Sequence, residues 1–159
     1  MKKLIFIVLA LFIFSSFSAY CFDTRLLDLR NKFFEESQQI KSILPASKDA
    51  VLLTSMFDSC IIGMSQIDAY FAMLGILESI KKEILIDNPI DIIVDWLNGI
   101  KRTNDLNIKN LNTVTQNIED NTKIHIEKLK VYFRELNNQL NVELDKLSTL
   151  KKSLIIKRK

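Results

Sequence analysis

Apolar residues recur every three or four positions in the last third of the chain, across residues 106–154, with no Gly or Pro between them. This spacing places them on one face of an α-helix. The stripe consists of Leu111, Val114, Ile118, Thr122, Ile126, Leu129, Phe133, Leu136, Leu140, Leu144, Leu147, Leu150 and Leu154. We expect its central part, Leu129, Phe133, Leu136, Leu140, Leu144 and Leu147, to carry helix-to-helix contacts, and we call these six residues the interaction stripe.

The course of the chain near Asn121 has two interpretations. Residues up to Thr122 are rich in Asn and Thr, which have weak helix propensity, so a turn at residues 120–122 would give four helices of similar length. The stripe nevertheless passes through Ile118, Thr122 and Ile126 in phase, and Glu119 precedes Lys123 by four positions, which supports a helix. We therefore favour one continuous helix.

Two further helices are expected in the first half of the chain. The first carries Leu26, Leu29, Phe33, Ile40 and Leu44 at helical spacing and ends at Pro45. The second begins with Ser47 as its cap and runs to about Ile86. On it, small residues form a strip where the backbone of a neighbouring helix can come close: Ser65, Ala69, Ala72 and Gly75.

A third helix is expected to begin at Asn88 and Pro89, because Asn caps a helix and Pro loses no hydrogen bond at the first helical position. Asn98 and Gly99 are a natural place for it to stop or bend. Residues 61–77 are apolar enough to suggest a membrane span, but Asp68 lies near their middle, which favours a buried core helix.

These elements predict an all-α protein, an elongated helical bundle or antiparallel coiled-coil-like helices. The expected domains are a signal peptide or membrane anchor at residues 1–20, one helical domain at 21–150 and a basic tail at 151–159.

The N-terminus has the order of a secretory signal peptide. Lys2 and Lys3 precede an apolar run at residues 4–14, and Ser16 and Ser18 follow as the small residues that cleavage requires. We expect export, with cleavage after Ser18. An uncleaved anchor and lipidation of Cys21 remain alternatives.

Charge is distributed unevenly along the chain. Of 22 basic residues, Lys2 and Lys3 belong to the signal, and five belong to the tail: Lys151, Lys152, Lys157, Arg158 and Lys159. The remaining 15 basic residues are outnumbered by 19 acidic residues, which argues against a nucleic-acid-binding protein. The tail is either a solvated helix end or a contact with an anionic membrane surface.

The inventory of reactive residues is small. His125 is the single histidine, and we interpret it as a solvated surface residue; the chain offers too few ligands for a metal site. Asp58 and Asp68 are too far apart on a helix to share a proton. Cys21 and Cys60 either form a disulfide, or Cys60 is a buried apolar residue while Cys21 is free or lipidated. We expect no cofactor and no enzymatic activity.

The richness in Lys, Ile and Asn is similar to that of exported proteins of AT-rich bacteria. We expect an exported helical protein of the periplasm or cell surface that acts through protein-protein interaction, with itself or with another helical envelope protein. The alternative is a small-ligand or lipid carrier at the envelope. In that case an internal cavity would be lined by Phe33, Phe34, Phe57, Phe71 and Trp96.

Overall fold

The computed structural model describes residues 24–80, 89–114 and 117–156, with the side chains of residues 78 and 156 left aside. They form the α-helices α2 (Thr24–Ile43), α3 (Ala50–Ser79), α4 (Pro89–Thr113) and α5 (Asp120–Ile156), and the short 3-10 helix η2 (Leu44–Ala46). These residues contain no strand, so the all-α prediction is confirmed for the described part of the chain. The signal peptide, Cys21, Asn88, Lys157, Arg158 and Lys159 lie outside it.

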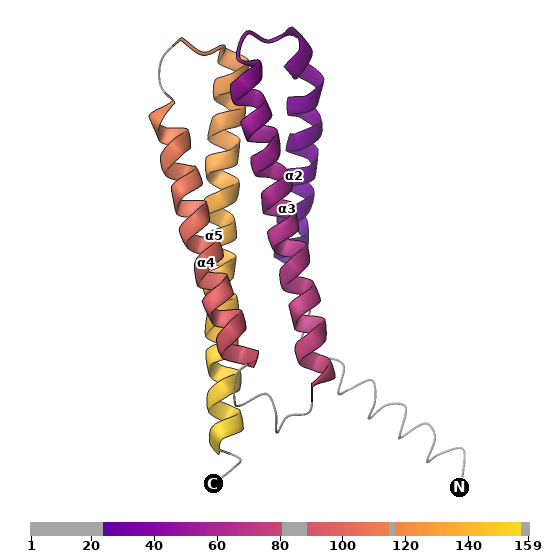
Figure 1. The fold of residues 1–159 in the computed structure, drawn as a ribbon, viewed down its shortest axis with the longest axis vertical. Helices are drawn as coiled ribbons and strands as arrows, with labels where there is room; N and C mark the ends of the chain where they lie inside the picture. Colours follow the sequence, from indigo (N-terminus) through magenta and orange to yellow (C-terminus); the bar gives the residue numbers. More distant parts are fainter. Residues whose placement is uncertain (1–23, 81–88, 115–116, 157–159) are drawn as a thin grey trace, which may run out of the picture.

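The four α-helices run alongside one another (Figure 1). α2 packs on α3, and α4 packs on α5; α2 also contacts α5, while α3 contacts both α4 and α5. The α2–α3 connection and the α4–α5 turn lie at the same end of the molecule, and α2 covers only the half nearest that end (Figure 1). The core is therefore built from all four helices near the turns and from three helices farther away.

Each helix faces the core with the residues that recur at helical spacing. On α3 the buried positions are Leu53, Met56, Cys60, Gly63, Ile67, Tyr70, Leu74 and Leu77, spaced by three and four. On α5 the interaction stripe lies inside the chain: five of its residues are at most 2% exposed, and Leu144 is partly buried. The predicted stripe is thus the internal seam of α5.

The continuous helix expected over residues 106–154 is wrong. α4 ends at Thr113 and α5 begins at Asp120, with Asn117 between them at a φ of 58°, a left-handed conformation that Asn tolerates. Val114 and Ile118 both pack against the core from this turn, which explains why the stripe stays in phase across it. The weak helix propensity of this Asn- and Thr-rich region prevailed over its periodicity.

The helix boundaries agree with the sequence-based expectations at the two prolines and differ from them elsewhere. Pro45 ends the first helix, and Pro89 begins α4, as predicted. α4 does not stop at Gly99 but passes through it, and the hydroxyl of Thr103 donates to the Gly99 carbonyl within the same helix. The N-cap position of α3 is Asp49 rather than Ser47, without a capping hydrogen bond from the Asp49 side chain, and α3 ends at Ser79.

Candidate functional site

A buried ionic cluster joins α2, α3 and α5. Glu36 on α2 has a side chain only 1% exposed, and its Oε1 lies against Nδ1 of His125 on α5. Its second oxygen, Oε2, lies 3.1 Å from Nζ of Lys128, which also donates to Oε1 of Gln39 at 2.8 Å. The Glu36 carboxylate is thus surrounded by positively charged or hydrogen-bonding groups, as a carboxylate removed from water requires.

The interpretation of His125 as a solvated surface residue is therefore wrong. The residue is buried beside Glu36, which was not among the inward-facing positions expected for the first helix. The helical spacing places both residues on the apolar side of their helices. Glu36 continues the series Leu29, Phe33 and precedes Ile40 by four, and His125 lies four positions before Leu129. A charged residue at an apolar position of one helix indicates a polar partner on a facing helix.

Cys60 lies on the α3 side of this cluster as a buried, free thiol. Burial and, to a smaller extent, the negative charge of Glu36 together raise the pKa of Cys60 to about 12. The thiol is therefore protonated at neutral pH and is a poor nucleophile. The structure supports the reading of Cys60 as a small buried apolar residue, while the role of Cys21 stays a prediction.

A second buried carboxylate lies farther along the same core. The Tyr70 hydroxyl on α3 donates to Oε2 of Glu143 on α5, and Nζ of Lys146 donates to Oε1 of Glu143 at 2.6 Å. Glu143 is 4% exposed. This group joins α3 directly to α5. Within the described ranges, no three His, Cys, Asp or Glu side chains are grouped so that they could hold a metal ion.

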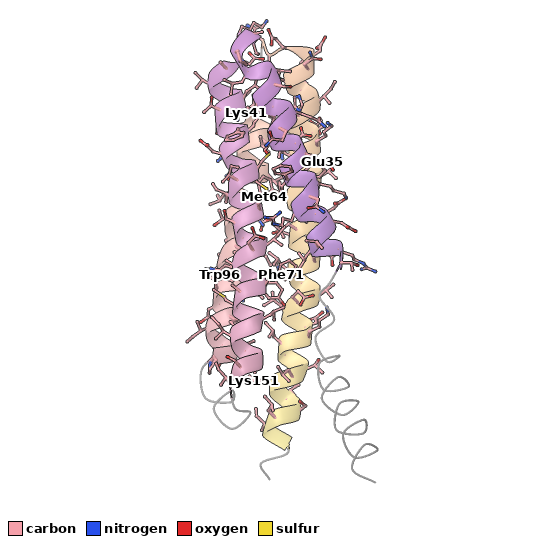
Figure 2. All side chains as sticks on the ribbon, turned by 90° about the vertical axis from the view of Figure 1, so that its right-hand side faces the viewer. Glu35, Lys41, Met64, Phe71, Trp96 and Lys151 are labelled. Atoms are coloured by element: carbon pink, nitrogen blue, oxygen red, sulfur yellow. The ribbon has the colours of Figure 1, made fainter. Side chains whose placement is uncertain are left out.

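The five aromatic residues considered as the lining of a ligand cavity have different surroundings. Phe33 is fully buried against Phe133, with ring centroids 5.2 Å apart, whereas Phe34 is 50% exposed. Phe71 lies between α3 and α5, and Trp96 lies on α4 (Figure 2). Phe57, Phe71 and Trp96 are partly buried against the core. Phe33 thus serves as a core residue, and Phe34 faces solvent.

A polar cleft lies between α2 and α5. It has a volume of about 360 Å³ and is lined by Arg25, Asp28, Leu29, Lys32, Glu135, Asn138 and Gln139. Lys32 and Glu135 form an ion pair across it at 2.8 Å. The lining carries both positive and negative charges, so its residues do not favour an anion over a cation.

The outward side of α3 combines small residues, exposed apolar side chains and few charges. Ser65, Ala72 and Gly75 are exposed and Ala69 is partly buried, so the small-residue strip faces away from the other described helices. No atom outside the helix lies within 4 Å of a Cβ built on Gly75. Large apolar side chains on the same side are also exposed: Val51 (88%), Ile61 (40%), Ile62 (45%) and Ile76 (59%). Together, these eight residues form what we call the α3 outer face.

The basic end of the chain is partly engaged. Residues 151–156 continue α5 rather than forming a separate tail. Nζ of Lys151 lies 2.5 and 2.7 Å from the two carboxylate oxygens of Asp91, in the first turn of α4. Lys151 lies toward the end of the molecule opposite the two turns (Figure 2). Lys152 is exposed, so among the described basic residues of this region only Lys152 projects fully into solvent.

One described helix, spanning Ala50–Leu77 of α3, is long and apolar enough to cross a membrane, a criterion that the core helix of a soluble protein also meets. No family model, curated protein or solved structure matches the chain.

Proposed function

We propose that the chain is an exported, non-enzymatic helical protein of the bacterial periplasm or cell surface, whose helices form an elongated bundle. It acts through the α3 outer face by binding a protein, either a second copy of itself or another helical envelope protein. The observation that carries this proposal is the character of that face. A solvent-exposed side of a helix normally carries charged residues, and a contiguous exposed apolar surface usually marks a contact.

The contrast with the other helices supports the proposal. α3 has three charged residues among 30, all acidic: Asp58, Asp68 and Glu78. α2 has seven charged residues among 20, and α5 has twelve among 37. Asp68 is already neutralised by Arg30 of α2, whose Nε lies 2.6 Å from the Asp68 carboxylate. The α3 outer face thus has the low charge that characterises the centre of protein interfaces.

The buried carboxylates of Glu36 and Glu143 have structural partners that account for their positions. Glu36 is paired with His125 and Lys128, and the raised pKa of Cys60 keeps its thiol protonated. A nucleophile needs the opposite arrangement, a lowered pKa and access to a substrate. These groups therefore favour a structural role, which is consistent with a protein that acts through its surface.

The proposal is tested in bacterial cells that produce the chain from its full sequence. We expect the protein in the periplasmic or surface fraction, with its mass reduced by about twenty residues. A photoreactive amino acid at Ser65 should crosslink to a protein, whereas the same probe at Asn110, exposed on α4, should not. An intact Met1 in the cytoplasm, or equal crosslinking from both positions, would contradict the proposal.

A further inference from the structure

The α3 outer face has an approximate internal symmetry about Ala69. Ile62 precedes Ala69 by seven residues, and Ile76 follows it by seven, so each isoleucine lies within about 20° of Ala69 on the same side of the helix. Between the two isoleucines lie the small residues Ser65 and Ala72, which are exposed. The face therefore has a bulky residue at each end and a low centre.

A surface of this form is complementary to itself when a copy is turned by 180°. In an antiparallel pair of α3 helices with the two-fold axis at Ala69, Ile62 of one chain lies opposite Ile76 of the other, and each Ala69 lies opposite its equivalent. Such a contact is the same patch on both subunits, which is the requirement for a symmetric dimer. The small residues at the centre let the two backbones approach closely.

The charges select the antiparallel direction. Asp58 is the one acidic residue on this side of α3 that is exposed and has no ion pair among the described contacts. In a parallel pair the two Asp58 carboxylates would lie side by side and repel each other. In the antiparallel pair they lie at opposite ends, about 33 Å apart along the axis at about 1.5 Å per residue.

A membrane is a less suitable occupant of this face. Helices that lie on lipid usually carry Lys or Arg beside their apolar side, and α3 contains neither. On these grounds we infer that the α3 outer face binds a second copy of the chain, as an antiparallel, two-fold symmetric α3–α3 contact. The inference rests on the proposed function, because it names the partner for the surface proposed there.

The contact makes a specific prediction for disulfide trapping. The protein is produced from the full-length sequence with Cys21→Ser, which leaves Cys60 as a buried thiol. Ala69→Cys should then form a disulfide-linked dimer under mild oxidation, because residue 69 meets itself at the axis. Ile62→Cys alone and Ile76→Cys alone should form no disulfide-linked dimer, but a mixture of these two variants should form a linked heterodimer.

Sedimentation measures the strength of the same contact. Wild-type protein should sediment as a dimer at about 100 μM, and Ala72→Lys should weaken dimerisation by at least about tenfold, because it places a charge at the closely packed centre. Asn110→Lys adds the same charge on α4 and should have no effect. Circular dichroism should show equal helix content in all three proteins, so that a loss of dimer is not a loss of fold.

Several outcomes overturn the inference. A wild-type monomer at this concentration, linking of Ile62→Cys to itself, or equal effects of the two lysine variants would each do so. Binding of a monomeric wild type to phosphatidylcholine vesicles, abolished by Ala72→Lys, would assign the face to lipid instead. A monomer whose Ser65 probe crosslinks only to a different envelope protein would overturn the inference while leaving the proposed function intact.

Discussion

Asp49 and Glu119 are 70 residues apart in the sequence, yet each carboxylate accepts a hydrogen bond from the segment that carries the other. The Asp49 carboxylate accepts the backbone N–H of Glu119 at 2.7 Å, immediately before α5. The Glu119 carboxylate accepts the Ser47 hydroxyl at 2.5 Å and the Lys48 N–H at 3.5 Å, immediately before α3. These hydrogen bonds join the segment before α3 to the segment before α5.

Asp49→Ala should lower the free energy of unfolding by about 1–2 kcal/mol, because it leaves the backbone N–H of Glu119, just before α5, without its acceptor. Urea denaturation followed by circular dichroism measures this. Asp145→Ala removes an exposed carboxylate from α5 and should change stability by less than about 0.5 kcal/mol. A double-mutant cycle with Glu119→Ala should reveal coupling between the Asp49 and Glu119 carboxylates, and strict additivity would show that they act independently.

Gly63 and Gly99 provide a matched pair of substitutions within helices. A Cβ at Gly63 would lie 2.8 Å from Cζ of Phe33, a ring that is fully buried and packed against Phe133 and Tyr132. Gly63→Ala should therefore destabilise the protein, by about 1–3 kcal/mol before the gain in helix propensity is subtracted. Gly99→Ala meets no atom within 4 Å and should stabilise it by about 0.5–1 kcal/mol.

Thermal unfolding of the two glycine variants gives the comparison directly. The midpoint should fall for Gly63→Ala and rise for Gly99→Ala relative to the wild type. A rise in both would mean that Phe33 can move aside and that the contact between α2 and α3 is looser than the structure indicates.

The sequence predicts those features of the fold that depend on one helix at a time. Pro45 and Pro89 fixed a helix end and a helix start, and the periodic apolar residues identified the inner side of α5. The turn before Asp120 was missed because Val114 and Ile118 keep the periodicity although the chain leaves the helix between them. Periodicity reports which residues face the core, and it does not by itself report that the backbone is helical.

Features that depend on two helices were not predicted. Glu36 and His125 are 89 residues apart, and neither segment by itself shows that the two side chains meet. The small-residue strip on α3 was expected to lie against a neighbouring helix, but the other helices that the structure describes leave it largely exposed. Both cases required the arrangement of the helices, because a residue's environment is set by what the facing element supplies.

The His125 and Glu36 pair should be costly to break and inexpensive to replace. His125→Ala removes one partner and leaves a buried carboxylate with Lys128 alone, so we expect a loss of about 3 kcal/mol in unfolding free energy. The double variant Glu36→Met with His125→Leu replaces both groups with apolar side chains of similar size and should recover most of that loss. Urea denaturation at constant pH measures both.

A small effect of His125→Ala, below about 1 kcal/mol, would contradict this account of the cluster. Glu127→Ala is the control, because Glu127 is an exposed acid of the neighbouring turn of α5, with a side chain 68% exposed. It should change stability only slightly, as removal of one member of a surface ion pair usually does.

The buried Cys60 thiol should make the stability of the fold sensitive to alkaline pH. Burial raises the pKa of Cys60 from an ordinary 9.0 to about 12, and the Glu36 carboxylate acts in the same direction. Because the folded-state pKa is the higher one, the contribution of the thiol to stability is complete below about pH 9 and is lost as pH rises toward 12. Between pH 9 and 12 the unfolded chain binds fewer protons than the folded chain, so the free energy of unfolding must fall with pH.

This alkaline loss is isolated by comparing two proteins, both with Cys21→Ser. On moving from pH 8 to pH 10.5, the protein that retains Cys60 should lose up to about 2 kcal/mol more unfolding free energy than its Cys60→Ala counterpart. Tyr132 does not cancel from this difference, because its pKa is raised by burial first and in part also by Cys60, so the difference reports the thiol together with its interaction with Tyr132. At pH 8 the Cys60 thiol should resist iodoacetamide until urea unfolds the chain, since the reagent requires a thiolate that it can reach. Parallel pH curves for the two proteins, or rapid alkylation of the folded protein, would show that Cys60 is accessible and not buried beside Glu36.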